Sequence, residues 1–335
     1  MTDLTKQVST NLRPNTLAEF AGQQQLVGEL NILLGAARAR RECPDHILLA
    51  GPPGLGKTTL ANIVAQELAL PLVSTSAPAI AKPGDLLALL TGVTTPSVVF
   101  VDEIHALERR AEELLYTAME DRHVDMIIGE GVNARTIRLE IQPFTLIGAT
   151  TQMGMLSAPL RGRFGFLGRL VPYTDSELAG IVTRSANVLG ITIETDAALV
   201  IARRSQGTPR IANRWLRRVR DWVQMHERDT IDVAGAEAAL LEFGIDELGL
   251  DPLARDILQT AIAQFNGGPV GIQSLAAAVG EAESTISDVY EPHLLREGLI
   301  TRTRQGRIVT EKGWKHLGLT PGASAVVELF PENNA

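Results

Sequence analysis

The segment HILLAGPPGLGKTTLA, at positions 46–61, constrains this chain more than any other feature. It opens with an apolar run, residues 47–50, that predicts a buried strand. The pattern Gly-x4-Gly-Lys-Thr follows, and an apolar segment of helical period then runs to Leu70. Glycines in such a turn let backbone N–H groups face phosphate oxygens that a Cβ would obstruct. Strand, loop and helix therefore stand in the order that a phosphate-binding loop requires.

Two side chains of this loop have chemistry suited to a nucleotide. Lys57 places a compact positive charge on the outer phosphates, and the Thr58 hydroxyl is a suitable Mg²⁺ ligand. The helix that begins near Lys57 adds the positive end of its dipole. The alternative, a glycine-rich turn with a chance lysine, is disfavoured by the flanking strand and helix. We therefore predict binding of a nucleoside triphosphate.

Further apolar runs predict a parallel sheet around this loop. The predicted strands cover residues 47–50, 72–76, 97–101 and 144–150. Helical patterns separate them, and this alternation indicates right-handed crossovers between parallel strands. The expected fold class is α/β.

Polar residues stand where two of these strands end. Asp102 is expected to hold the Mg²⁺ shell, and Glu103 to orient and deprotonate an attacking water. An acidic helix start is the alternative for this pair. Thr150 and Thr151 end another strand, at the edge where open α/β sheets keep ligands, so a hydroxyl there can sense the outer phosphate. An ordinary threonine at a strand end is equally compatible.

Arginines follow in three places. Arg161 and Arg163 lie on one short segment, and Arg210 opens a later helix. Arginine stabilises charge on a transferring phosphoryl group, although surface arginines are usually only solvated. Four more follow on the same helix, and most of them are interpreted as a solvated or subunit-facing surface: Arg214, Arg217, Arg218 and Arg220.

Residues 124–141 predict a β-hairpin, because Val124, Met126 and Ile128 alternate along the first strand and a Gly-Glu-Gly break follows. Its apolar face either packs on its own domain or forms a docking surface for a partner protein.

The C-terminal half predicts two further units. Residues 175–247 carry helical patterns throughout. Residues 248–335 open with predicted helices at 253–265, 272–279 and 283–297, and a hairpin with a loop at 303–306 follows. Three helices before a hairpin is the order of a winged helix-turn-helix.

Charge on the predicted wing is opposite to that of the chain. Residues 299–315 carry a net charge of +4, whereas the whole chain carries −8. A basic wing suits phosphate and minor-groove contact, and a protein-docking module is the alternative. The preceding helix is acidic, which disfavours base reading in the major groove.

Composition indicates a cytoplasmic protein. A single cysteine, Cys43, excludes an internal disulfide, no signal-peptide pattern opens the chain, and no apolar run approaches ~20 residues.

Taken together, these motifs resemble the RuvB family, the AAA+ ATPases that drive bacterial Holliday-junction branch migration in recombination and repair. The matching segments are GPPGLGKTTLA, VDEIHAL, MEDRHVDMIIGEG, PFTLIGATT, APLRGRFG, RRSQGTPRIANRWLRRVRD, FNGGPVGIQSLAAAVGE and DVYEPHLLREGLI. The resemblance runs from about Leu12 to Leu319. It implies an AAA+ ATPase domain over residues 1–174, a helical lid domain over 175–247 and a winged-helix DNA-binding domain over 248–335.

The resemblance implies roles for individual residues. Asp102 and Glu103 would be the second acidic motif, Thr150 and Thr151 the first sensor, and Arg163, with Arg161 second in line, the finger that reaches a neighbouring subunit's nucleotide. The residues implied to hold ATP within one subunit are Leu12, Arg13, Gly54, Lys57, Thr58, Thr59, Tyr173 and Arg210, with Thr58 and Asp102 toward Mg²⁺. Glu120, Asp121 and Arg122 would line the nucleotide interface, and Arg302 and Arg307 would touch DNA.

The implied partners are duplex and four-way junction DNA, RuvA at the 124–141 hairpin, the RuvC resolvase and five further copies of the chain in a homohexamer. A membrane is not among them. Two other functions remain open: a clamp-loader-type ATPase, and a nucleotide-gated DNA-binding regulator with negligible turnover.

The chain departs from the family pattern at four places. Residues 152–154 read Gln-Met-Gly where Arg-Ala-Gly is usual, and Gly162 replaces an acidic residue between the two arginines. Glu283 replaces an expected basic residue, and Arg304-Gln305 displaces one wing arginine. These departures affect expected DNA affinity and subunit coupling more than ATP binding.

Overall fold

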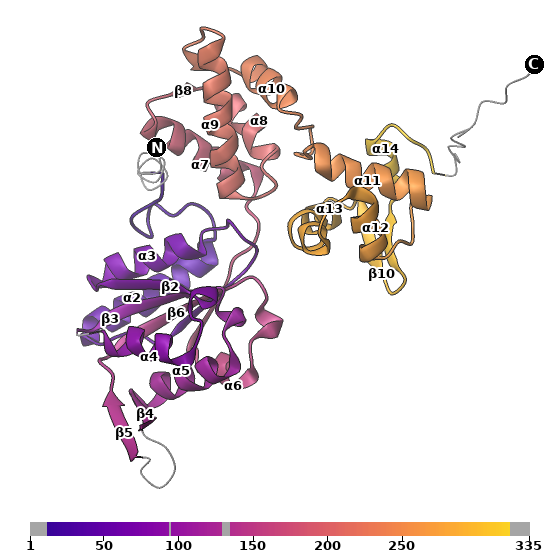
Figure 1. Ribbon diagram of the computed structural model, residues 1–335. Coiled ribbons are helices and arrows are strands. Elements are labelled where there is room, and N and C mark those ends of the chain that lie inside the picture. Colours follow the sequence, from indigo (N-terminus) through magenta and orange to yellow (C-terminus); the bar gives the residue numbers. More distant parts are fainter. Residues whose placement is uncertain (1–11, 94, 129–134, 322–335) are drawn as a thin grey trace, which may run out of the picture. The chain divides into compact units, whose positions relative to one another are not determined.

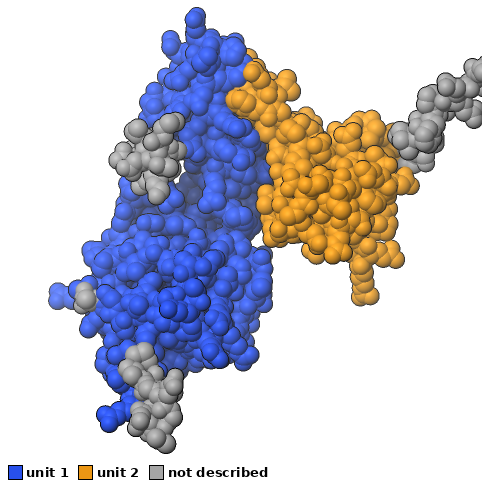
Figure 2. Space-filling view, in the orientation of Figure 1, with its two compact units in different colours: residues 1–233 blue, residues 234–335 orange. Residues whose placement is uncertain are grey.

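The computed structural model describes residues 12–93, 95–128 and 135–321. The chain divides into two compact units, residues 1–233 and residues 234–335 (Figure 2). Among the described residues, no helix has the length and apolar character needed to cross a membrane.

Unit 1 is built around a five-stranded parallel sheet in the order β2-β3-β6-β1-β7. Its strands are β1 (Ile47–Ala50), β2 (Leu72–Ser76), β3 (Ser97–Asp102), β6 (Phe144–Thr150) and β7 (Phe166–Arg169). The first four confirm the predicted strands. The edge strand β7 was not predicted, because its four residues include Gly168 and Arg169 and form no apolar run.

Helices cover both faces of this sheet, and β1 and β6 are accordingly buried along their whole length (Figure 1). The covering helices are α2 (Gln24–Arg40), α3 (Lys57–Leu68), α4 (Pro83–Thr91), α5 (Arg109–Asp121) and α6 (Ala158–Arg161). One core cluster joins side chains of α4 and α5 to Leu48, Val99 and Leu146 on one face of the sheet. Successive strand residues point to opposite faces, so the intervening residues pack under the other helices.

The predicted hairpin is confirmed. Strands β4 (His123–Ile128) and β5 (Arg135–Glu140) pair antiparallel, with Val124 opposite Leu139. The predicted Gly-Glu-Gly break lies at 129–131, outside the described residues. Arg138 donates two hydrogen bonds, of 2.9 and 3.1 Å, to the Asp125 carboxylate on the facing strand. The hairpin is therefore tied across its strands by a cross-strand ion pair.

The rest of unit 1 is mainly helical. Its helices are α7 (Asp175–Val188), α8 (Thr195–Arg203) and α9 (Pro209–Met225). Thr174 begins α7 with a capping box, since its side chain accepts from Glu177 N and the Glu177 carboxylate accepts from Thr174 N. The expectation of a purely helical region was wrong in one respect, because β8 (Thr192–Ile193) and β9 (Thr230–Ile231) form a short parallel pair.

Unit 2 begins within α10 (Val233–Glu242) and has the winged-helix order. Its elements after α10 are α11 (Pro252–Phe265), α12 (Ile272–Val279), a π-helical turn (Thr285–Tyr290), α13 (Glu291–Arg296), β10 (Ile300–Thr303), β11 (Gly306–Val309) and α14 (Glu311–His316). The predicted continuous helix at 283–297 is interrupted by the π-helical turn. The predicted loop at 303–306 is also too long, because Thr303 pairs with Gly306 and only two residues form the turn.

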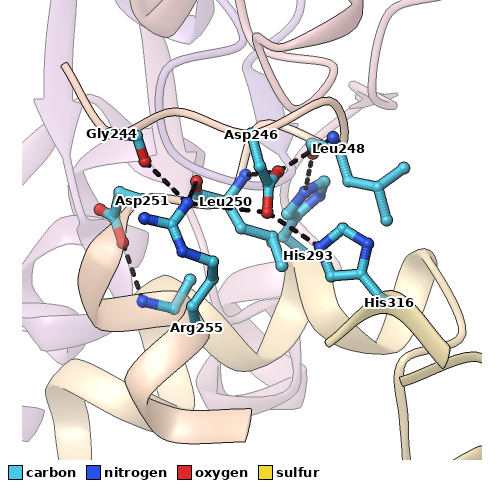
Figure 3. Close-up of polar contacts among 9 residues, drawn as sticks. Gly244, Asp246, Leu248, Leu250, Asp251, Arg255, His293 and His316 are labelled. Atoms are coloured by element: carbon cyan, nitrogen blue, oxygen red, sulfur yellow. Dashed lines mark hydrogen bonds and ion pairs between the residues drawn. The ribbon is translucent and has the colours of Figure 1, made fainter. Parts of the chain in front are cut away.

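The segment that joins α10 to α11 is held by hydrogen bonds within unit 2 (Figure 3). The Asp246 carboxylate accepts from the backbone N–H groups of Leu248 and Leu250, and His316 Nε2 lies 2.8 Å from its other oxygen. Arg255 donates to the carbonyls of Gly244 and Leu250. These contacts anchor the segment to the helices and to the last helical turn of the winged-helix fold.

Candidate functional site

A pocket of about 460 Å³ lies in unit 1, beside the phosphate loop and the carboxyl end of β3. It gathers ten of the residues predicted to serve ATP or Mg²⁺: Leu12, Arg13, Gly54, Lys57, Thr58, Thr59, Asp102, Glu103, Tyr173 and Arg210. These residues come from the N-terminal segment, the loop and the helix after it, the sheet edge, the segment before α7 and the start of α9. The fold therefore brings together side chains separated by up to about 200 positions.

Gly54 explains why the phosphate loop reaches the helical region. Its φ of +81° lies in the left-handed region, where a side chain would be strained. A Cβ there would also lie 2.8 Å from Thr208 Cγ2 and 3.1 Å from Arg210 Cβ. A glycine at this position thus permits the close approach that places Arg210 beside the loop.

Lys57 is the buried cation of the pocket, with an exposed fraction of 7%. Its ammonium donates to the carbonyls of Gly51 at 2.7 Å and Pro52 at 3.0 Å, so the side chain lies along the loop that it follows. Burial lowers the pKa of this ammonium, while the carboxylates of Glu103 and Asp102 raise it. Because Lys57 also begins α3, its charge adds to the positive end of that helix.

The opposite end of the pocket is lined by residues that the motifs did not identify. Arg184 donates from Nη2 to the Leu12 carbonyl at 2.6 Å, and Asn213 and Arg217 lie on α9 facing the same pocket. Most arginines of this helix were interpreted as a solvated or subunit-facing surface, and Arg217 is the one of the four that lines the pocket. Its position one turn after Asn213 on a helix that begins beside the loop was the available signal.

Tyr173 closes this part of the pocket. Its hydroxyl donates to the Leu55 carbonyl at 3.1 Å, and burial raises the pKa of the phenol, so it remains a neutral donor. Its backbone N–H donates to the Gly207 carbonyl, which connects it to the turn before α9. Tyr173 therefore joins the phosphate loop to the helical region.

Both threonines predicted to be the first sensor lie near Glu103 at the sheet edge. Glu103 has left-handed backbone angles, φ 48° and ψ 45°, which are uncommon for a residue with a side chain. Thr151 donates its hydroxyl at 2.9 Å and its N–H at 3.3 Å to Glu103 Oε2. Thr150 is fully buried, and its hydroxyl oxygen accepts from Gln152 N.

Arg163 lies outside this pocket. Nη2 and Nε donate to Glu120 Oε2 at 2.6 and 3.1 Å, and Cζ lies 4.7 Å from the centroid of the Tyr116 ring. Nη1 donates to the Pro159 carbonyl. Glu120, Asp121 and Arg122 are exposed at the end of α5, and Arg161 is exposed as well. The predicted finger and the predicted interface residues thus share one surface of unit 1.

The two arginines predicted to touch DNA differ in environment. The Arg302 side chain is 65% exposed, whereas that of Arg307 is only 10% exposed. Arg307 donates from Nε and Nη2 to the two carboxylate oxygens of Glu291, at 3.1 and 2.9 Å. The guanidinium of Arg307 is therefore engaged inside the unit, and its predicted contact with DNA stays a prediction.

Comparison with known proteins agrees with this architecture. Residues 12–170 match the family model "Holliday junction DNA helicase RuvB P-loop domain", residues 173–246 the "RuvB AAA lid domain" and residues 247–318 the "RuvB C-terminal winged helix domain". The three models follow one another in the same order as the predicted domains.

Whole-chain relatives carry the same family name. The chain is 52% identical over 323 residues to the Holliday junction branch migration complex subunit RuvB of Corynebacterium diphtheriae, covering 96% of this chain and 89% of that protein. The RuvB subunit of Corynebacterium jeikeium is also 52% identical, over 94% of this chain and 89% of its own. The solved Thermotoga maritima RuvB Holliday junction branch migration motor is 47% identical with a TM-score of 0.84, covering 92% of this chain and 99% of its own. Since 52% identity extends over nearly the whole chain and three family models match in succession, this chain belongs to the RuvB family.

Proposed function

We propose that this protein is an ATP hydrolase that drives branch migration of four-way DNA junctions in recombination and repair. The observation that carries the proposal is the pocket in which Lys57, Asp102, Glu103 and Arg210 surround a phosphate loop. The name of the 52% identical relatives supports the choice of DNA junctions as the substrate of the motor.

Five residues of the pocket have a part in the proposed hydrolysis. Glu103 accepts a proton from the water that attacks the γ-phosphorus, the bond to the bridging oxygen breaks, and ADP leaves. Lys57 and Arg210 stabilise the charge on the phosphate oxygens. Thr58 and Asp102 line the same pocket and offer the hard oxygen ligands that Mg²⁺ takes, so we assign the ion to them. When bound, Mg²⁺ neutralises charge on the β- and γ-phosphate oxygens.

We propose that turnover requires a ring, specifically a homohexamer. Arg163 lies outside the pocket of its own chain and is held there by Glu120. An arginine in that position serves a nucleotide on a neighbouring subunit, with Glu120, Asp121 and Arg122 on the same surface. Arg210 instead belongs to the pocket of its own chain, so it links the nucleotide to the helical region.

The functional division of the chain follows from these assignments. We propose residues 1–174 as the ATPase domain, 175–247 as the lid and 248–335 as the DNA-binding domain. The matched ranges of the three family models support this division. On the wing we assign phosphate contact to the exposed Arg302 and Arg304 and a structural role to Arg307.

For partner proteins, we propose the 124–141 hairpin as the docking site of RuvA. The 43% exposed Ile137 on β5 supports this assignment, while the buried Val124 shows that part of the hairpin packs on its own domain. We further propose that the protein works with the RuvC resolvase in a larger complex and that it is located in the cytoplasm. Both are expected of a bacterial junction motor.

The proposal is tested by ATP-dependent migration of a synthetic four-way junction, with and without RuvA, in the parent and in Arg163→Ala. We expect migration that RuvA stimulates and that Arg163→Ala abolishes. ATPase stimulation should grow with duplex length. Arg40→Ala is the control, since Arg40 is 58% exposed, pairs with Glu42 and has no role assigned to it.

Two results would contradict the motor. Hydrolysis of ATP without junction movement, even with RuvA, would indicate a loader-type ATPase that switches a partner. If the Glu103→Gln variant kept the full function of the parent, the protein would be a nucleotide-gated DNA-binding regulator whose function needs no ATP hydrolysis.

A further inference from the structure

His105 lies at the catalytic edge of the sheet, and no step assigned so far uses it. It belongs to the single turn of 3-10 helix, Ile104–Ala106, that directly follows Glu103. The left-handed backbone of Glu103 bends the chain, so that His105 returns alongside the end of β6. Its side chain is 11% exposed, and Nδ1 lies 3.3 Å from Glu103 Oε2 and 3.0 Å from Thr150 Oγ1.

The surroundings of Nδ1 favour a proton on this nitrogen. An unprotonated Nδ1 would place lone-pair density 3.3 Å from the carboxylate oxygen of Glu103, and the two would repel. A proton on Nδ1 instead hydrogen-bonds with Thr150 Oγ1 at 3.0 Å and brings positive partial charge close to the Glu103 carboxylate. We therefore infer the Nδ1–H form, in which one N–H group lies beside both residues.

The hydrogen bonds of Glu103 are unequally divided between its two oxygens. Oε2 accepts the hydroxyl and the N–H of Thr151, and Nδ1 of His105 lies 3.3 Å from the same oxygen. Within the described part of the chain, no donor contacts Oε1. One oxygen is thus anchored from two elements, β6 and the turn after β3, while the other is available to accept a proton from water.

We propose that His105 is a positioning residue for ATP hydrolysis. Its Nδ1–H holds Oε2 of Glu103 and ties the carboxylate to Thr150, so that Oε1 stays aimed at the attacking water. This inference rests on the proposed function, because it assumes that Glu103 is the general base. His105 itself is not among the residues that line the pocket.

Two amide substitutions test the proposal. The side-chain amide nitrogen of Asn lies as many bonds from Cβ as Nδ1 of histidine, whereas that of Gln matches Nε2. His105→Asn therefore preserves a donor at the position of Nδ1, and His105→Gln moves it away. His105→Ala removes it.

We expect kcat for ATP to fall about 10-fold in His105→Ala and His105→Gln, as for the loss of one hydrogen bond to a charged group. His105→Asn should stay within about threefold of the parent. KM and the Kd of a fluorescent ADP analogue should change less than twofold in all three, because the phosphate contacts remain. Melting temperatures of the variants accompany these measurements.

Parental kcat in His105→Ala would overturn the proposal. An equal loss of kcat in His105→Asn, His105→Gln and His105→Ala, together with a lowered melting temperature, would also overturn it. That pattern indicates a histidine with a purely structural role. The activity of the parent protein tests the proposed function separately, because a parent that binds ATP but does not hydrolyse it contradicts the ATPase proposal. The ratio of kcat in His105→Asn to kcat in His105→Gln tests the role of His105.

Discussion

Two arginine–glutamate pairs, one in each unit, use the same chemistry in opposite settings. In unit 1, Arg163 and Glu120 meet at 2.6 Å with side chains 30% and 60% exposed. In unit 2, Arg307 and Glu291 meet at 2.9 Å with side chains 10% and 3% exposed. Both arginines were predicted to be functional from their place in a motif. Only the burial of the side chains distinguishes Arg163, which can exchange Glu120 for another partner, from Arg307, which cannot leave Glu291.

The difference in burial decides what each pair can do. An exposed ion pair contributes about 0–1 kcal/mol, so Arg163 can leave Glu120 for a phosphate at little cost. Removing one member of a buried pair leaves an uncompensated charge in a low dielectric, at a cost of about 3–5 kcal/mol. Arg307 therefore connects β11 to α13 through a buried ion pair with Glu291. The comparison predicts that one arginine governs turnover and the other governs stability.

The largest expected effect is on turnover in Arg163→Ala. Removal of an arginine finger costs about 10³–10⁵ in rate, while the stability of the chain should change by less than about 1 kcal/mol. Mixing Arg163→Ala with Glu103→Gln subunits should restore part of the ATPase activity. A mixed ring contains sites with Glu103 from one chain and Arg163 from the other. Absence of any recovery in mixtures that form rings would contradict a finger acting between subunits.

The next effect is on folding in Arg307→Ala. Because Glu291 is left buried with only Arg302 near it, at 4.0 Å, the free energy of unfolding of unit 2 should fall by about 3–5 kcal/mol. The fluorescence of Trp314, which is buried in the core of this unit, follows denaturant unfolding in a background where Trp215 and Trp222 of unit 1 are replaced with Phe. Replacing both partners with apolar residues, Glu291→Leu with Arg307→Met, should recover most of the loss. A decrease of less than about 1 kcal/mol in the free energy of unfolding of Arg307→Ala would contradict the proposed difference in stability between the buried and the exposed ion pair.

The smallest effect is on DNA binding in Arg302→Ala. Arg302 lies 4.0 Å from Glu291 and is largely exposed, so its loss should leave folding unchanged and weaken duplex binding a few-fold. One lost phosphate contact should reduce the slope of log affinity against log salt by about 1. Lys315→Ala is the control, because Lys315 pairs with Glu311 on α14. An unchanged salt slope would exclude Arg302 from the DNA surface.

Much of the fold was predictable because its signals are local. The strands at 47–50, 72–76 and 144–150 have the predicted bounds, since each is a short segment that opens on an apolar residue and lies between helical patterns. The edge strand β7 has no such run and is defined by its pairing with β1. The π-helical turn before α13 likewise leaves no periodic signal that separates it from an α-helix.

The residues of the candidate site also divide into those that local sequence signals predict and those that depend on tertiary packing. Lys57, Thr58, Asp102 and Glu103 were identified by sequence alone, because phosphate and metal chemistry restrict which residue types can serve at that spacing. Arg184 and Arg217 were not, because their access to the pocket depends on how the helical region packs over the loop.

By itself, the sequence determined the phosphate loop, the parallel strands, the hairpin and the winged-helix order, since hydrophobic period and glycine conformation act over a few residues. Only the tertiary structure decided which charged groups are buried. Glu291 and Arg307 are 16 positions apart, and His105 and Thr150 are 45 apart. The strength of an ion pair or hydrogen bond depends on the surrounding dielectric, and that environment exists only once distant segments have packed together.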